Sequence, residues 1–211
     1  MKIIEIFRCI QGECSLQGEM MAFVRTAGCN LRCAWCDTKY AYKGGRNMPL
    51  SRIVAKVRKL RCKWVNITGG EPLIQSEMPA LVDALKELDF KVVIFTNGTI
   101  DIARLPNVDK FVVDWKLPSA HPKEAFNMVN LNRLSPADEL KFVVKDTVDY
   151  TVMKDILEGV KIRCKVLVSP ALDGKSMKWA KELAEMIAFD NLEVRYSLQI
   201  HKVLWGNRRG V

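Results

Sequence analysis

Short runs rich in β-branched and aromatic residues alternate along this chain with longer segments that carry apolar residues at helical spacing, and this alternation constrains the fold more than any other feature. It is typical of sheets built from βα units. We expect strands at residues 3–7, 21–26, 64–68, 91–96, 110–114, 141–144, 165–168 and 192–196. The sequence therefore predicts an α/β fold with one curved, partly barrel-like sheet.

Three of the intervening segments have the apolar stripe of an amphipathic helix. Ser51 is placed to cap the first helix, and we expect the third at residues 175–189. The stripes are Ile53, Val54, Val57 and Leu60 in the first helix, Met78, Leu81, Val82, Leu85 and Leu88 in the second, and Trp179, Leu183, Met186 and Ile187 in the third. Such stripes indicate core packing and carry no functional information.

The composition limits the class of protein. The 211 residues are 49% apolar and contain no linker or solenoid-type repeat, so we expect one core and a single domain over residues 1–211. No apolar run reaches the ~20 residues that span a bilayer, and the first residues lack the pattern of a secretion signal. Seven cysteines, an odd number, then favour reduced thiols or metal ligation over disulfides. We expect a cytoplasmic protein with no membrane contact.

The net charge of +9 is compatible with phosphate binding, but most of the basic residues are scattered among acidic ones. The compact basic clusters are residues 58–63 and the pair Arg208 and Arg209. The same charge could attract a small anionic substrate. We therefore expect no direct contact with nucleic acid.

Three cysteines lie within eight residues, in the sequence GCNLRCAWC that follows the strand ending at Thr26. Cys29, Cys33 and Cys36 can surround one metal centre. A structural zinc ion usually takes four protein ligands, whereas a 4Fe-4S cluster held by three thiolates leaves one iron open to a ligand. The spacing favours the cluster, with zinc or a purely structural loop as weaker alternatives.

A second motif, GGEP, follows the strand that ends at Thr68. Gly69 and Gly70 leave the backbone open to a ligand, and Pro72 prevents strand pairing from continuing. In a parallel sheet, this motif and the cysteine loop lie at the same edge, where chemistry collects.

The CxxxCxxC loop, with an aromatic residue before its last cysteine, resembles the signature of the radical S-adenosylmethionine (SAM) superfamily, and GGEP resembles its site for the methionine amino group. This resemblance implies a partial TIM-type βα barrel. It also implies a single 4Fe-4S cluster on Cys29, Cys33 and Cys36 whose open iron chelates SAM. An electron passed through the cluster then releases a 5'-deoxyadenosyl radical.

Further segments resemble the 7-carboxy-7-deazaguanine synthase family over nearly the whole chain. They are IQGE at 10–13, FVRTAGC at 23–29, CDTKY at 36–40, TNGT at 96–99, DWK at 114–116, SP at 169–170 and SLQIHK at 197–202. The resemblance implies a lyase that converts 6-carboxy-5,6,7,8-tetrahydropterin to 7-carboxy-7-deazaguanine with loss of ammonia, and requires Mg²⁺. It also implies a homodimer and an electron donor such as flavodoxin or ferredoxin.

The same resemblance assigns the site residues, without a certain catalytic base. Thr38 is implied as the magnesium ligand. The SAM site comprises Trp35, Cys36, Asp37, Gly70, Asp114, Trp115, Lys116 and Ser169. The substrate site comprises Ile10, Gln11, Gly12, Glu13, Arg25, Thr68 and His201.

Two positions depart from the family. Cys14 stands where the family's QGE is usually followed by glycine, and the tail 202–211 puts in doubt a contact between a chain-terminal carboxylate and the substrate. The rival interpretations are a glycyl-radical activating enzyme, which acts on a protein, and a non-catalytic, basic metal-binding or RNA-associated module. The sequence does not determine whether the product enters a queuosine, archaeosine or secondary-metabolite pathway.

Overall fold

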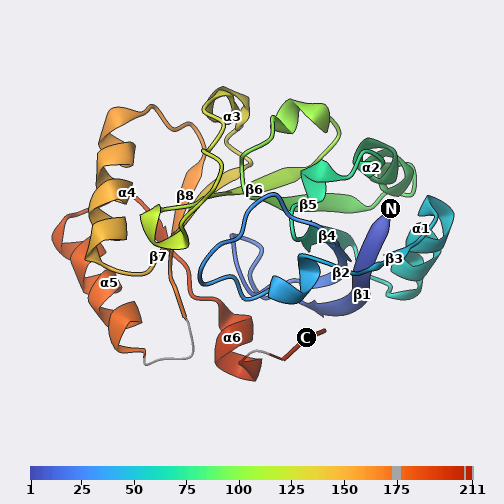
Figure 1. The fold of residues 1–211 in the computed structure, drawn as a ribbon, viewed down its shortest axis with the longest axis horizontal. Coiled ribbons are helices and arrows are strands. Elements are labelled where there is room, and N and C mark those ends of the chain that lie inside the picture. Colours follow the sequence, from blue (N-terminus) through green and yellow to red (C-terminus); the bar gives the residue numbers. More distant parts are fainter. Residues whose placement is uncertain (173–176, 207, 211) are drawn as a thin grey trace.

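The computed structural model describes residues 1–172, 177–206 and 208–210. Nine of its strands form one sheet in the order β3-β1-β2-β4-β5-β6-β7-β8-β9. From β2 to β9, neighbouring strands in this order are parallel, and β1 and β3 extend the sheet antiparallel at one edge. The strands are β1 (Lys2–Ile10), β2 (Met20–Thr26), β3 (Arg46–Asn47), β4 (Trp64–Gly69), β5 (Lys91–Thr96), β6 (Lys110–Trp115), β7 (Glu139–Val144), β8 (Lys165–Pro170) and β9 (Arg195–Tyr196). The curved sheet is open, as in a partial barrel (Figure 1).

Helices cover the outer face of the sheet, from α1 and α2 at one end to α4 and α5 at the other (Figure 1). The helices are α1 (Leu50–Lys59), α2 (Met78–Lys86), α3 (Val129–Arg133), α4 (Thr147–Gly159), α5 (Lys178–Phe189) and α6 (Ile200–Trp205). Their buried faces and the apolar strands share the main core, which includes Ile53, Leu81, Phe142 and Leu183. The sequences of such strands are continuous apolar runs because the side chains on both faces of the sheet are buried.

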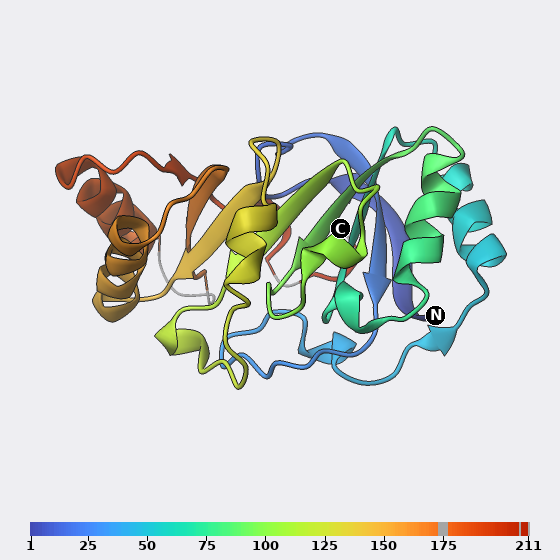
Figure 2. The ribbon, with the colours of Figure 1, turned by 90° about the horizontal axis from the view of Figure 1, so that it is seen from above.

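The long loop after β2 runs along one edge of the sheet, across the ends of the strands (Figure 2). It contains the three cysteines and reaches the loop after β6, where Ala34 N donates a hydrogen bond to Ala120 O at 3.1 Å. The described helices include none that is long and apolar enough to cross a membrane. The fold therefore gathers the loop motifs at one edge.

The structure confirms the α/β class and all the predicted strands, with differences at their ends. β1 extends to Ile10, and the strand expected at 192–196 is reduced to Arg195–Tyr196. The capping role expected for Ser51 is wrong, because α1 begins at Leu50 after Pro49 and places Ser51 inside the first turn. Leu88 lies beyond α2 and is 42% exposed. Residues 175 and 176 of the third expected helix lie outside the described residues.

Candidate active site

Two adjoining pockets open where the parallel strands end. We call the first the cysteine pocket, because Cys29, Cys33 and Cys36 line it, and the second the arginine pocket, because Arg25, Arg208 and Arg209 line it. Residues that line both pockets are Glu13, Asp37, Thr38, Thr68, Phe95 and Lys202. A ligand in one pocket can therefore contact a ligand in the other.

The cysteine loop is anchored from two sides. Trp35 Nε1 donates a hydrogen bond to Ser119 Oγ at 3.0 Å, and Ser119 N donates to the buried carboxylate of Asp149 at 2.9 Å. Leu31 and Cys33 are buried against Ala120, and Cys29 and Cys36 pack on the same cluster. All three cysteines thus line the cysteine pocket.

An iron–sulfur cluster binds cysteine side chains as thiolates. Burial raises the pKa of Cys29 and Cys33, and the ammonium of Lys116 opposes this rise at Cys33. Metal binding would remove the proton, since only the thiolate is a ligand. Among the described residues, no three His, Cys, Asp or Glu side chains are grouped as ligands of a metal ion.

The GGEP motif lies directly against the cysteine loop. A Cβ atom on Gly70 would lie 1.9 Å from Gly28 O and 2.9 Å from Cys29 Cβ, so only glycine permits this approach. Glu71 is fully buried and accepts hydrogen bonds from Leu73 N, Thr96 Oγ1 and Asn97 N at 2.7–3.0 Å. Burial raises its pKa. Glu71 therefore holds the turn after β4 to the end of β5.

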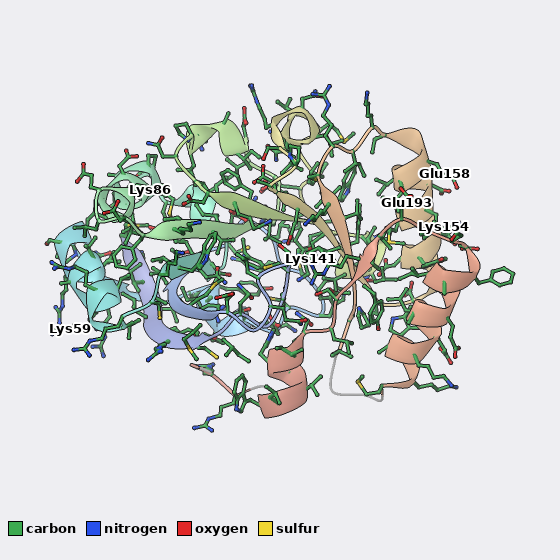
Figure 3. All side chains as sticks on the ribbon, turned by 180° about the vertical axis from the view of Figure 1, so that it is seen from behind. Lys59, Lys86, Lys141, Lys154, Glu158 and Glu193 are labelled. Atoms are coloured by element: carbon green, nitrogen blue, oxygen red, sulfur yellow. The ribbon has the colours of Figure 1, made fainter. Side chains whose placement is uncertain are left out.

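Acidic and basic side chains alternate through the cysteine pocket. Lys116 Nζ lies 2.9 Å from Asp114 Oδ2, and Lys141 Nζ lies 3.7 Å from the same oxygen and pairs with Glu13 on its other side. Figure 3 shows Lys141 near the centre of the molecule, whereas Lys59 and Lys86 lie toward the rim. The Lys141 side chain is only 4% exposed.

These charges determine the protonation of Glu13. Burial opposes its ionisation, but Lys141 and His201 outweigh burial and lower the pKa of Glu13 to about 2. Burial likewise disfavours the charged form of Lys141, but Glu13 and Asp114 outweigh it and raise the pKa of Lys141. Glu13 and Lys141 are therefore both ionised at neutral pH.

Several buried polar atoms have no partner among the described residues: Asp114 Oδ1, Ser169 Oγ and Gln199 Oε1. Asp114 and Gln199 line the cysteine pocket, so these oxygens can accept hydrogen bonds from a bound molecule such as SAM. Together with Gly70 and the three cysteines, which line the same pocket, they fit a cluster and SAM.

Most of the residues expected to bind SAM line the cysteine pocket: Trp35, Cys36, Asp37, Gly70, Asp114 and Lys116. Two do not. The Trp115 ring stacks on Phe126 at 4.1 Å and packs against the core, so this side chain faces away from the pocket. Ser169 is fully buried behind the lining, with its hydroxyl unpartnered among the described residues.

All seven residues expected to bind substrate come together. The arginine pocket is lined by Ile10, Gln11, Gly12, Glu13, Arg25, Thr68 and His201. Gly12 lies so close to α6 that a Cβ atom would be 2.1 Å from His201 Nδ1. Gly12 O also accepts a hydrogen bond from Ile200 N at 3.0 Å, which ties α6 to the loop after β1.

Arg25 is already held by a partner. Its Nε donates to Glu5 Oε1 at 2.7 Å, and Tyr40 Oη donates to the same oxygen at 2.9 Å. The ion pair with Glu5 is compatible with a role of Arg25 in substrate binding, because Glu5 orients a guanidinium that lines the pocket. Arg209 extends this group, since its Cζ lies 3.7 Å from the centre of the Tyr40 ring.

Thr38 lies where the two pockets meet. Its hydroxyl donates to Asp37 Oδ1 at 2.7 Å, and Lys202 Nζ lies 3.1 Å from Asp37 Oδ2. Burial opposes ionisation of Asp37, but Lys202 and Thr38 lower its pKa well below its usual range. The terminal carboxylate of Val211 lies outside the described residues.

Sequence reasoning missed several polar residues of the two pockets, namely Asn66, Lys141, Gln199 and Lys202. Asn66 and Lys141 carried a usable signal, because each interrupts the apolar run of a strand that is buried on both faces. A polar side chain in such a strand needs a buried partner or a ligand.

Comparisons with known proteins agree with this geometry. A model described as "Radical SAM superfamily" matches residues 23–187. The 7-carboxy-7-deazaguanine synthase of Koribacter versatilis is 39% identical, with 97% of each chain covered, and that of Thermoplasma acidophilum is 38% identical over the full length of both. The crystal structure of QueE from Escherichia coli has the same fold, with a TM-score of 0.75 at 24% identity over 93% of this chain and 92% of that one. The chain therefore belongs to the radical SAM superfamily and, within it, to the 7-carboxy-7-deazaguanine synthase family, as a radical SAM enzyme of 7-deazaguanine biosynthesis.

Proposed function

We propose that this protein converts 6-carboxy-5,6,7,8-tetrahydropterin to 7-carboxy-7-deazaguanine with loss of ammonia. The observation that carries the proposal is the junction of two pockets, one lined by the three cysteines and the other by all seven expected substrate residues. This junction supports an arrangement in which SAM occupies the cysteine pocket and the pterin the arginine pocket. We further propose a single domain and a homodimer that receives its electrons from a flavodoxin or ferredoxin.

In this proposal, Cys29, Cys33 and Cys36 hold the cluster. When bound, the cluster and SAM supply the 5'-deoxyadenosyl radical that takes a hydrogen atom from the substrate. The main chain at Gly70 and the carboxylate of Asp114 bind and orient SAM.

The residues of the arginine pocket bind the substrate at its two ends. The cations Arg25 and Lys202 attract its carboxylate, to which His201 can donate a hydrogen bond, whereas Gln11 and Glu13 pair with the polar edge of its ring. The apolar rings of Phe7, Phe23 and Phe95 form walls that exclude water from a reactive radical.

Magnesium belongs at the junction of the pockets in this proposal. Thr38 supplies one neutral oxygen there, and Mg²⁺ commonly completes its octahedron with water and substrate oxygens. Asp37 accepts the hydrogen bond of the Thr38 hydroxyl and so holds its lone pairs toward the junction. The ion would neutralise the substrate carboxylate during rearrangement.

The test is an anaerobic assay of the reconstituted enzyme with reductant, Mg²⁺, SAM and 6-carboxy-5,6,7,8-tetrahydropterin, in which product is followed by mass spectrometry. We expect 7-carboxy-7-deazaguanine from the wild type and none from Cys33→Ala. The variant Cys62→Ala is the matched control, because Cys62 is a buried cysteine outside both pockets. Formation of 5'-deoxyadenosine without deazaguanine would refute the proposed substrate and leave the superfamily assignment intact.

A further inference from the structure

Asn66 lies at the floor of the arginine pocket. It is in the middle of β4, two residues before Thr68. On the neighbouring strand β2, Phe23 lies opposite Asn66 and Arg25 lies opposite Thr68. Side chains two apart on a strand point to the same face, and this spacing is about 7 Å. Asn66 is therefore one layer deeper in the sheet than Thr68 and Arg25.

The Asn66 side chain carries an acceptor that nothing in the described protein satisfies. The residue is 2% exposed, and no described residue donates a hydrogen bond to its Oδ1. Buried polar groups are almost always paired, and an unpaired one destabilises the folded state. Asn66 lines the arginine pocket, and its buried Oδ1 is an acceptor without a partner among the described residues, which a ligand N–H that enters this pocket can supply.

The surroundings of Asn66 indicate the class of ligand. Phe23 and Phe95 line the same pocket and suit a flat ring. Gln11, also 2% exposed, uses its own Oε1 to accept a hydrogen bond from Glu13 N at 3.1 Å, so its acceptor is taken. The cations Arg25, Arg208 and Arg209 line the pocket as well and attract an anionic end.

We propose that Asn66 Oδ1 accepts a hydrogen bond from an N–H group of the substrate's aminopyrimidinone ring, and so selects a ring that enters with its donor edge first. The inference rests on the proposed function and adds a specificity-determining residue to it. A site built to pair a ligand N–H discriminates strongly against a ligand that lacks it, because the acceptor is then left unpaired.

The test compares two ligands and two variants. Binding is measured by quenching of ligand fluorescence, without turnover, for 6-carboxypterin and for pteridine-6-carboxylate, which lacks both the amino group and the ring N–H. Asn66→Leu removes the acceptor at similar volume, and Asn66→Asp keeps an acceptor oxygen. Asn107→Leu, at an exposed asparagine bonded to Asp83, is the matched control.

We expect the wild type and Asn107→Leu to prefer 6-carboxypterin. Asn66→Leu should raise the Kd of 6-carboxypterin by about 10- to 100-fold and leave the Kd of pteridine-6-carboxylate within about threefold of its wild-type value. Asn66→Asp should retain the preference for 6-carboxypterin. If the role of Asn66 were only structural, Asn66→Leu would weaken the binding of both ligands alike. Equal losses for the two ligands, or no loss in Asn66→Leu, would overturn the inference.

Turnover separates this inference from the proposed function. If the wild type forms 7-carboxy-7-deazaguanine and Asn66→Leu has an unchanged KM, only the role of Asn66 fails. If the wild type neither binds 6-carboxypterin nor forms product, the proposed function fails, and the inference fails with it.

Discussion

Replacing Lys141 by methionine should destabilise the protein and change how its stability depends on pH. Lys141 pairs with Glu13 and lies 3.7 Å from Asp114, at a position only 4% exposed. The pKa of Glu13 lies at about 2, compared with an ordinary value of 4.5. At about 1.4 kcal/mol per pKa unit, this depression corresponds to roughly 3 kcal/mol, similar to the usual cost of removing one partner from a buried pair.

The sign of the pH effect differs between the wild type and Lys141→Met. In the wild type, the contribution of Glu13 is present above pH 4.5 and is lost as the pH falls toward 2. Without Lys141, burial becomes the dominant effect on Glu13 and raises its pKa above the ordinary value. The variant should then lose stability as the pH rises above about 5, so its deficit is larger at pH 8 than at pH 5.

Anaerobic thermal unfolding of the reconstituted enzymes at pH 5 and pH 8 measures this effect. A loss of about 3 kcal/mol lowers the Tm of a chain of this size by about 6–12 °C. The double variant Glu13→Gln/Lys141→Met removes both charges and should recover part of the loss. A Lys141→Met enzyme with the Tm of the wild type at both pH values, or a double variant no more stable than Lys141→Met, would refute this account of the charge network.

Four further predictions concern the loops around the pockets. Gly12→Ala should raise the substrate KM at least tenfold with an unchanged far-UV spectrum, because the added Cβ would lie 2.1 Å from His201 Nδ1; an unchanged KM would contradict this contact. Thr38→Ala should raise the Mg²⁺ concentration for half-maximal rate by about tenfold and leave SAM cleavage without substrate intact, and equal Mg²⁺ curves would exclude Thr38 as a ligand. Burial raises the pKa of Cys14 to about 12, so at pH 8 iodoacetamide should label it far more slowly in the native protein than in urea, as a peptide map can check. Cys14→Gly should keep the fold, since Cys14 has a φ of 60° that glycine adopts freely; a lower Tm by more than about 5 °C would argue that the thiol packs an essential contact.

Much of the architecture could be predicted because it is local in the sequence. The apolar runs located the strands, since a strand covered on both faces has to be apolar. The cysteine loop and GGEP followed two of those strands, so the parallel arrangement placed them at one edge. The period of two along a strand also explains Trp115, whose ring packs in the core while its neighbours Asp114 and Lys116 line the cysteine pocket.

The ends of elements were less certain because they depend on single contacts. α1 begins at Leu50 after Pro49, whose extended backbone ends the preceding segment, and not at Ser51. The last strand is two residues long, as only Arg195 and Tyr196 pair with β8. A hydrophobic pattern does not contain this information, because it reports burial and not hydrogen-bond register.

By itself, the sequence determined the α/β class and the cysteine loop and, through its family resemblance, many of the residues that line the two pockets, because these depend on hydrophobic pattern and short motifs. Only the tertiary structure decided which charges meet. Lys141 reaches Glu13 across the sheet, and Arg25 faces Glu5 because an irregularity in β1 sets their register. Such contacts join residues far apart in the chain, and the order and register of the strands, which depend on the packing of the whole sheet, determine them.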